Sequence, residues 1–342
     1  MHPLYLEDLI AVCDGLGDVE GLRGKRVLIT GITGMIGSCM ADALTVLNER
    51  RGLGLTIFGV SRNPDRSRER FPGVRLIAAD LSDPKGDLPA ADIVVHAASN
   101  AHPAAFSADP VGTMLGNLLG TRALLEQLRM AGGGRLLFVS TGEIYGENPA
   151  VTDGFSETDF GRIDPINPRS CYPESKRAAE TLCASYVRQY GVDAVVARLC
   201  YIYGPTLSDA NTRADAQFLR NALNGEDIVM KSFGTQVRSY AYVTDAIAGL
   251  LTILLRGTRG EAYNVSSRLS TASIREYAET LAKLAGVKVR FDLPSEQERQ
   301  GYSTVTRAVQ KGDKLEALGW QPRVALEEGL RRTLSIKREG LR

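Results

Sequence analysis

Tyr172 and Lys176 are the two side chains of this sequence whose types and spacing best suit acid–base chemistry. They stand four positions apart in a segment with helical periodicity, which puts both on one face of a helix. Tyr172 is also the one tyrosine of 12 that has lysine at position i+4. A lysine ammonium beside a phenol favours the phenolate, and a bound nicotinamide cation would strengthen the effect. Tyr172 is therefore a candidate general base, and an exposed surface pair is the alternative.

Two further polar residues directly follow the apolar strand that we expect near Leu136–Ser140. The end of this strand is the carboxyl edge of a sheet, where α/β proteins bind ligands. We expect Thr141 to hold the hydroxyl group that reacts and Glu143 to act as acid or base on a neighbouring carbon. Capping of a helix or turn is the alternative role for both residues.

A glycine-spaced turn, G-x-x-G-x-x-G, lies between an apolar strand (Arg26–Thr30) and an amphipathic helix (Met35–Arg50). Glycines let the backbone approach a pyrophosphate closely, and a helix N-terminus offers free N–H groups to it. The turn therefore predicts a dinucleotide site, and a tight strand–helix turn without a ligand is the alternative. The cofactor-binding residues predicted here are Gly31, Thr33, Gly34, Met35, Ile36 and Gly37.

The choice between NAD and NADP depends on the end of the second strand, where an acidic residue usually binds the ribose 2′-hydroxyl. This chain has Arg62 there, and an arginine can pair with a 2′-phosphate, so the local chemistry leans slightly toward NADP. Adenine stacking or simple exposure would explain Arg62 equally well. Asp80, which ends the third strand, could accept a hydrogen bond from the adenine amine or could be a turn residue.

Short apolar runs alternate with longer amphipathic segments through the first two hundred residues, which predicts a doubly wound, mainly parallel α/β sheet. We divide the chain into an N-terminal arm (1–24), a dinucleotide-binding domain (25–204) and a smaller α/β lobe (205–342) for the substrate. Segments such as 237–265 could return to the first domain. Further expected strands are Leu55–Val60, Val74–Ile77, Ile93–His96 and Ala194–Leu199, and expected helices are Val111–Met130, Tyr172–Tyr190, Ala214–Asn224, Asp245–Arg256 and Ile274–Ala285.

Composition argues against several classes of protein. The chain has 41 basic and 40 acidic residues, so it lacks the basic excess that nucleic acid or anionic membranes attract. Five scattered cysteines without a C-x-x-C pair suit a reducing cytoplasm. The first residues lack a signal-peptide pattern, and the apolar runs are too short to span a bilayer. Isolated histidines such as His96 and His102 give no metal-ligand spacing.

These motifs together resemble the extended short-chain dehydrogenase/reductases, the family of NAD-dependent epimerases and dehydratases that modify nucleotide sugars. The resemblance covers about Gly24 to Leu334 and implies a Rossmann-type domain, a nucleotide-sugar lobe, a homodimer and a 4-keto sugar intermediate. It also adds Leu81, Ala97, Ala98, Ser99 and Asn117 to the predicted cofactor site, together with Tyr172 and Lys176. The motifs are 30–37 (TGITGMIG), 96–99 (HAAS), 117–121 (NLLGT), 140–146 (STGEIYG), 172–176 (YPESK) and 203–205 (YGP).

Within that family the segments around Tyr172, Arg238 and Trp320 are most similar to the UDP-glucuronate decarboxylases. The likeness implies that Tyr172 takes the 4-hydroxyl proton while hydride goes to the nicotinamide, and that the ketone then allows loss of carbon dioxide. It also implies that Arg238 binds the diphosphate and that Arg307 contacts the sugar or its leaving group. We add His102 and Tyr201 to the predicted substrate site.

Two positions depart from the decarboxylase pattern. Gly142 stands where those enzymes usually carry serine, and Tyr201 stands where they carry asparagine, so the selectivity for sugar or nucleotide differs. The 4,6-dehydratases place an aspartate at the position of Gly142, which makes dehydration the less favoured alternative. A 4-epimerase needs only the tyrosine–lysine pair and is compatible with the sequence. A regulator that senses NAD(P) without catalysis is the alternative from another class, although it would be expected to lose this pair.

Overall fold

The computed structural model describes residues 1–84, 88–293 and 305–341. Seven parallel strands form a central sheet in the order β10-β6-β5-β4-β1-β2-β3. The winding direction reverses between β1 and β4, and ligands of such sheets bind outside the carboxyl ends of the strands at this reversal. The strands are β1 (Arg26–Thr30), β2 (Thr56–Ser61), β3 (Arg75–Ala78), β4 (Ile93–His96), β5 (Arg135–Thr141), β6 (Asp193–Leu199) and β10 (Ala262–Val265).

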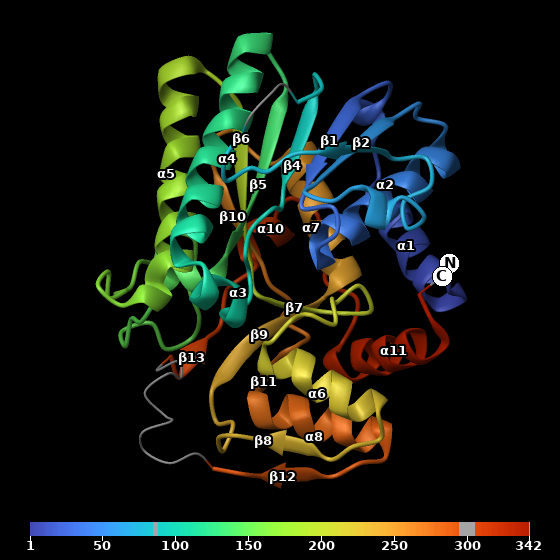
Figure 1. Cartoon of the computed structure of the whole chain (residues 1–342), viewed down its shortest axis with the longest axis vertical. Coiled ribbons are helices and arrows are strands. Elements are labelled where there is room, and N and C mark those ends of the chain that lie inside the picture. Colours follow the sequence, from blue (N-terminus) through green and yellow to red (C-terminus); the bar gives the residue numbers. More distant parts are fainter. Residues whose placement is uncertain (85–87, 294–304, 342) are drawn as a thin grey trace.

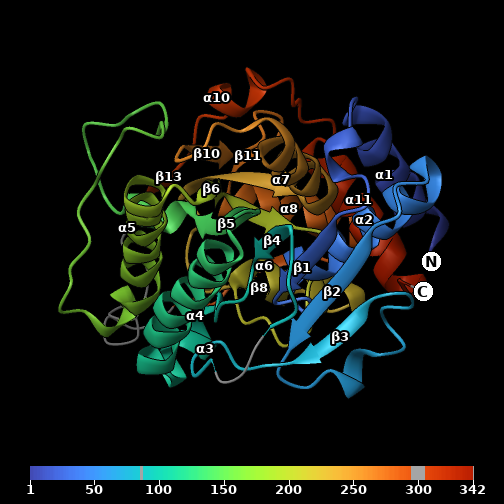
Figure 2. The same cartoon turned by 90° about the horizontal axis from the view of Figure 1, so that it is seen from above.

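Helices cover both faces of this sheet (Figure 2). Helices α4 (Pro110–Ala131) and α5 (Cys171–Tyr190) pack against each other on one face, with the short α3 (Pro103–Ala108) at their end. Helices α2 (Met35–Arg51) and α7 (Val243–Arg256) cover the other face. Because helices cover both faces of the sheet, all four residues of β4 are buried.

A smaller lobe lies beyond the carboxyl ends of the central strands (Figure 1). Its main sheet is built on β9 (Val237–Tyr242), which pairs with β7, β11 and β13. Tyrosine rings from β7, β9 and α8 pack together in its own hydrophobic core. The other elements are β7 (Tyr201–Tyr203), β8 (Ile228–Met230), β11 (Thr271–Ser273), β12 (Val289–Phe291), β13 (Arg307–Ala308), α6 (Ala214–Leu223), α8 (Ile274–Ala285), α10 (Asp313–Glu316) and α11 (Leu326–Glu339).

The N-terminal segment forms helix α1 (Pro3–Gly15), which packs on α2, α7 and α11 of its own chain. Leu9 is fully buried in the main core. The Asp8 carboxylate accepts hydrogen bonds from Tyr242 and Arg332, each at 2.8 Å. The two chain ends also meet, since the His2 backbone N–H donates to the Leu341 carbonyl at 3.0 Å. The segment is thus an integral layer of the structure.

The predicted fold class, a Rossmann-type doubly wound sheet with a smaller α/β lobe, is confirmed. The expected strands and helices occur with shifts of one or two residues at their ends, the largest being α7, which begins at Val243. Helix α7 and strand β10 belong to the layers of the main sheet, although they follow β9 of the smaller lobe. The division at residues 24 and 204 stays a prediction.

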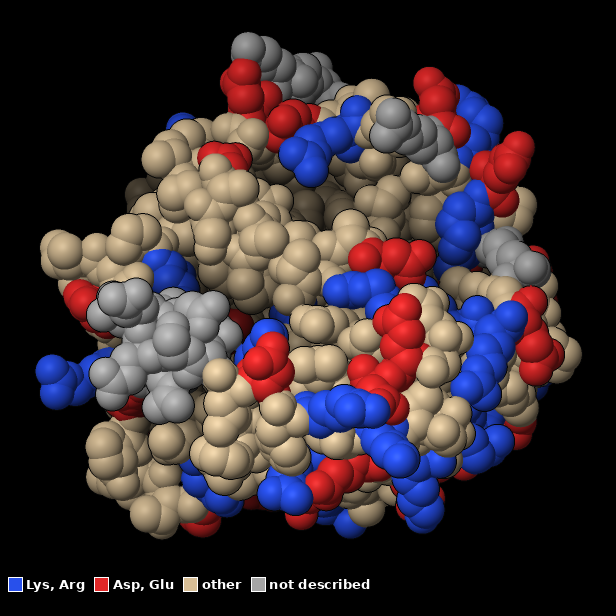
Figure 3. Space-filling model, turned by 60° about the horizontal axis from the view of Figure 1, so that its bottom comes forward, with Lys and Arg blue, Asp and Glu red and all other residues tan. Residues whose placement is uncertain are grey.

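Basic and acidic side chains are interspersed on the face seen in Figure 3, as the nearly equal numbers of the two kinds suggest. Among the described residues, no helix combines the length and the apolar character that crossing a membrane requires.

Candidate active site

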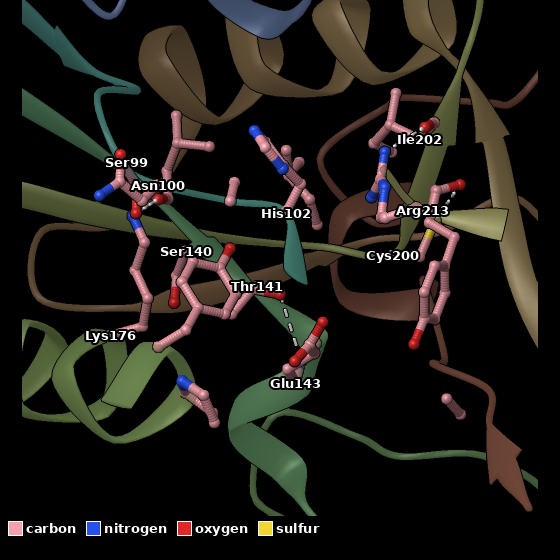
Figure 4. A pocket seen from close by; sticks show the side chains of 18 of the residues that line it. Ser99, Asn100, His102, Ser140, Thr141, Glu143, Lys176, Cys200, Ile202 and Arg213 are labelled. Carbon is pink, nitrogen blue, oxygen red and sulfur yellow. Dashed lines mark hydrogen bonds between the residues drawn. The ribbon is translucent and has the colours of Figure 1, made fainter. Parts of the chain in front are cut away.

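A cavity of about 1150 Å³ opens at the carboxyl ends of β1, β4 and β5 and has walls from both the main sheet and the smaller lobe. Figure 4 shows Thr141, Glu143 and Lys176 on one side of it and Arg213 on the other. The predicted site residues that line the cavity are Thr33, Gly34, Met35, Ile36, Gly37, Arg62, Ala97, Ser99, His102, Thr141, Glu143, Tyr172, Lys176 and Tyr201.

The glycine turn after β1 lies at one end of the cavity, and its backbone is packed too closely for side chains. Gly31 has a φ of 68°, and a Cβ on it would lie 2.7 Å from backbone atoms of Ala98. A Cβ on Gly37 would lie 2.2 Å from the Gly31 carbonyl oxygen. Helix α2 begins after Gly34 without a side-chain cap, so its first N–H groups remain available to a phosphate. These residues therefore fit the pyrophosphate of a dinucleotide.

Arg62 and Asp80 follow neighbouring strands but differ in their access to the cavity. Arg62 is exposed and lines the cavity just after β2. Asp80 Oδ1 accepts hydrogen bonds from the hydroxyl and the backbone N–H of Ser82, at 2.7 and 2.9 Å, which lower the pKa of the carboxyl group. Asp80 thus has the turn role that the sequence left open. Leu81 is buried against Gly120 and also lies outside the lining.

His96 ties β1 to β4 beneath the cavity. Its Nδ1 lies 2.7 Å from Thr30 Oγ1, and the same oxygen accepts a hydrogen bond from the Ala98 N–H at 3.2 Å. Burial, with a smaller effect of the Lys176 charge, lowers the pKa of His96 to about 3. His96 is therefore neutral at physiological pH and positions the segment 97–99.

Lys176 lies in the second turn of α5, and its ammonium points at β5. Lys176 Nζ donates to the Val139 carbonyl oxygen at 2.8 Å and lies 4.7 Å from the centre of the Phe138 ring. Burial lowers its pKa to about 8, against a smaller upward effect of Glu180. A lysine in this state can carry or release a proton near neutral pH.

Tyr172 lies one turn before Lys176 and is buried against Phe106. The two aromatic rings are stacked, with centroids 5.6 Å apart and planes at 9°. Burial and then the Glu143 charge raise the pKa of Tyr172, while hydrogen bonding to Thr141 counters the rise. Tyr172 therefore holds its proton in the unliganded protein, and a nearby positive charge is needed to make it a base.

Thr141 and Glu143 combine the two roles that the sequence left open. The Thr141 hydroxyl accepts a hydrogen bond from the Glu143 N–H at 3.2 Å and so caps the 3-10 turn Gly142–Tyr145. Both side chains also line the cavity (Figure 4). The turn thereby fixes an acid and a hydroxyl at the end of β5.

Arg213 is a cavity residue that our sequence analysis missed. Its Nε lies 3.6 Å from Asp215 Oδ1, and its Nη2 donates to the Ile202 carbonyl at 3.4 Å. Its buried Nε has no hydrogen-bond partner among the described residues. Arg213 stands in a polar loop without periodicity, where its charge was the only available signal.

Gln310 was also missed, because it follows a short strand far from every motif. It is buried, lines the cavity, and lies against Gly142. Its sequence neighbours show no apolar periodicity that would place it in a site.

Seven predicted residues lie outside the cavity lining. The Arg238 guanidinium is 4.2 Å from the centre of the Tyr201 ring, and of the two residues only Tyr201 lines the cavity. Asn117 is buried behind Tyr172 and donates to Ser175 Oγ at 2.8 Å. The full set is Gly31, Asp80, Leu81, Ala98, Asn117, Arg238 and Arg307, of which Arg307 is exposed at the start of β13.

No cluster of three or more His, Cys, Asp or Glu side chains in the described ranges could hold a metal ion.

Comparisons with known proteins agree with this geometry. Residues 27–266 match a family model described as NAD dependent epimerase/dehydratase family. UDP-glucuronic acid decarboxylase 6 of Arabidopsis thaliana is 33% identical over 310 residues, 89% of this chain and 86% of that protein. The NAD complex of Thermus thermophilus UDP-glucose 4-epimerase has 30% identity and a TM-score of 0.75, covering 92% of this chain and 99% of that one. The dTDP-glucose 4,6-dehydratase DesIV of Streptomyces venezuelae, with NAD and TYD bound, has 27% identity and a TM-score of 0.77, covering 92% and 97%.

Proposed function

Because the chain belongs to the NAD-dependent epimerase/dehydratase family, we propose that it oxidises the sugar of a nucleotide sugar transiently at C4. The observation that carries the proposal is the convergence of Thr141, Glu143, Tyr172 and Lys176 on one cavity whose other end is the glycine turn. A nicotinamide dinucleotide bound along that turn would accept hydride from the sugar and return it later.

The chain's own residues move and hold the protons. Tyr172 takes the proton of the 4-hydroxyl group once a positive charge near it favours the phenolate. Lys176 supplies such a charge whenever it is protonated, and its buried position prevents water from screening it. Thr141 holds the sugar hydroxyl by a hydrogen bond, and Glu143 serves the neighbouring carbon as acid or base.

Two fates of the 4-keto sugar fit the site. If C5 carries a carboxylate, the ketone lies β to it and accepts the electrons that loss of carbon dioxide leaves behind. If the sugar turns over in the cavity, hydride returns to the opposite face and the product is the 4-epimer. Similarity to UDP-glucuronic acid decarboxylases supports the first fate, and similarity to a UDP-glucose 4-epimerase supports the second. Dehydration is less favoured because Gly142 supplies no acid.

Arginines on the lobe side of the cavity are suited to the diphosphate of the substrate. Arg213 lines the cavity with a positive charge, and Asp215 Oδ1 lies 3.6 Å from its Nε, too far for a hydrogen bond. Arg238 lies outside the cavity lining, with its guanidinium 4.2 Å from the centre of the Tyr201 ring. We therefore assign the first anion contact to Arg213 and keep Arg238, Arg307 and His102 as secondary substrate residues.

The cofactor is the point on which local chemistry and the comparisons differ. Arg62 at the end of β2 is suited to a 2′-phosphate and supports NADP. The solved structures of the 4-epimerase and of DesIV contain NAD and support NAD. Titration of the wild type and of Arg62→Ala with both cofactors separates them, since an arginine–phosphate contact makes only NADP affinity fall in the variant.

We also propose a homodimer through α4 and α5 in the cytoplasm. Val111, Met114 and Leu115 expose apolar surface on α4, which a second copy would cover. All five cysteines are free, as expected in a reducing compartment. Light scattering of the purified chain tests the dimer.

Mass spectrometry of the products tests the function itself. The protein is incubated with UDP-glucuronate or UDP-glucose and with NAD or NADP. A product that has lost carbon dioxide establishes decarboxylation, and a product of equal mass that separates by chromatography establishes epimerisation. Unchanged substrate in every mixture would contradict the proposed activity on UDP-sugars.

A further inference from the structure

Gln310 fills the space next to Gly142 that a side chain at position 142 would occupy. A Cβ on Gly142 would lie 2.8 Å from Gln310 Cδ and 2.9 Å from both Nε2 and Oε1. The carboxamide therefore lies against Gly142, whose chain neighbours Thr141 and Glu143 line the same cavity as Gln310. In the proposed reaction Thr141 holds the reacting hydroxyl and Glu143 serves the neighbouring carbon, so a group that Gln310 offers to the cavity would meet the part of the sugar next to the oxidised carbon.

A chain of buried hydrogen bonds determines which end of the Gln310 amide faces the cavity. Arg198 Nη1 can only donate, and it donates to Tyr145 Oη at 3.0 Å. Tyr145 Oη in turn donates its proton to Asn264 Oδ1 at 2.6 Å. Asn264 Nδ2 donates to the carbonyl oxygens of Phe155 and Lys311, at 2.9 and 3.0 Å. The orientation of the Asn264 amide is therefore fixed, with its oxygen toward Tyr145.

Gln310 must then turn its nitrogen toward Asn264. Gln310 Nε2 donates to Asn264 Oδ1 at 3.1 Å and to the Arg198 carbonyl oxygen at 3.4 Å, which uses both of its N–H bonds. A flipped amide would set its oxygen against two acceptors. The Gln310 backbone is held as well, since its N–H donates to Ser239 Oγ at 3.1 Å. Within the described ranges no donor is bound to Gln310 Oε1, so this acceptor is left for a ligand.

We infer that Gln310 is a specificity-determining residue that accepts a hydrogen bond from an uncharged donor on the ring carbon next to the oxidised one. A hydroxyl or hydroxymethyl group satisfies Oε1, whereas a carboxylate has no proton to donate at neutral pH and faces the negative end of the amide dipole. Of the two fates of the 4-keto sugar, the contact favours epimerisation of a neutral sugar. This inference rests on the proposed transient oxidation.

The test compares two substrates that share a nucleotide and differ at C6, UDP-glucose and UDP-glucuronate. The kcat/KM for each is measured from cofactor reduction and from product formation. We expect the wild type to prefer UDP-glucose by about tenfold or more, because a buried acceptor facing an unsuitable group costs a factor of that order. A preference for UDP-glucuronate would overturn the inference and leave the proposed oxidation supported.

The variant Gln310→Met keeps the side-chain length and removes the whole amide, the acceptor Oε1 together with the two hydrogen bonds that Nε2 donates. We expect the kcat/KM for UDP-glucose to fall about tenfold and that for UDP-glucuronate to change little, so that the preference shrinks. Gln321→Met, at an exposed glutamine outside the cavity lining, is the matched control. Thermal melting establishes that both variants fold, and the wild-type preference remains decisive if Gln310→Met does not. An unchanged preference in a folded Gln310→Met protein overturns the inference, and absence of turnover of both sugars by the wild type overturns it together with the proposed function.

Discussion

Lys176 Nζ donates a hydrogen bond of 2.8 Å to the carbonyl oxygen of Val139. The Lys176 ammonium thereby links α5 to β5, the strand that ends in Thr141. The contact satisfies one of the three ammonium protons in a buried place. Because burial disfavours the charged form of Lys176, the free energy of unfolding depends on pH.

The ionisation of Lys176 should make the stability of the protein rise with pH above neutral pH. Lys176 has a pKa of about 8 in the folded protein, below its ordinary value of 10.5. Between these two values the unfolded chain binds more protons than the folded chain, so the free energy of unfolding rises with pH. We expect the stability of the wild type relative to Lys176→Met to increase from pH 8 toward pH 10. Urea unfolding of both proteins at several pH values measures it, and a constant difference would contradict the buried charge.

Tyr172→Phe should strongly reduce turnover and leave the fold intact. The phenyl ring keeps the stacking on Phe106 while the group that takes the proton is lost. We expect kcat to fall about 10²- to 10⁴-fold with little change in melting temperature or cofactor affinity. Tyr190→Phe, at an exposed tyrosine of the same helix, is the control and should keep full activity. Undiminished turnover in Tyr172→Phe would remove this residue from the mechanism.

Alanine variants of Gly31 and Gly24 separate the cost of backbone strain from the cost of a steric clash. Both have a φ of 68°, but a Cβ on Gly24 meets no atom within 4 Å, whereas one on Gly31 meets the backbone of Ala98. We expect Gly24→Ala to lower the free energy of unfolding by ~1 kcal/mol, the usual cost of a left-handed residue. Gly31→Ala should lower the free energy of unfolding by clearly more and should also weaken cofactor binding. Equal effects in chemical unfolding would show that the turn has room for a side chain.

Helix α1 should contribute to global stability through its buried face. Leu9 is fully buried and Leu6 is 37% exposed on the same helix. Leu9→Ala should lower the free energy of unfolding by about 2–5 kcal/mol, the range for a large-to-small change in a core. Leu6→Ala should cost less than ~1 kcal/mol. Similar values for both would mean that α1 docks only loosely.

Gly142→Ser and Gln310→Ala should have strongly non-additive effects. In the wild type a serine Cβ collides with the Gln310 amide, so Gly142→Ser should lower kcat/KM and stability. In the Gln310→Ala protein the same serine has space, and its additional effect should be small. The kcat/KM values of the wild type, the two single variants and the double variant give the coupling energy. Additive effects would show that the two side chains do not interact.

The sequence predicted most of the framework because its signals are local. Strands covered on both faces appear as short apolar runs, and the i, i+4 spacing brought Tyr172 and Lys176 to one helix face, as the structure has them. Thr141 and Glu143 were predictable because they directly follow a buried strand.

The residues that the sequence did not reveal depend on contacts between distant segments. Gln310 reaches the cavity because β13 pairs with β9 and because Asn264, 46 positions away, orients its amide. Arg213 lies in a loop that only the packing of α6 brings opposite Glu143. Arg238 was expected to bind the diphosphate, which stays a prediction, and the contact of its guanidinium with the Tyr201 ring is one that local sequence does not reveal.

The meeting of the chain ends bears on how the protein is made. Asp8 and its partner Arg332 are 324 positions apart, whereas α2, which also packs on α1, is the next α-helix along the chain. During synthesis α1 can therefore pack on α2 early, but the Asp8–Arg332 ion pair must wait about 15 to 70 seconds at usual elongation rates. The contact between α1 and α11 is thus a late step in the folding of this chain, and the first helix is a natural target for chaperones during that interval.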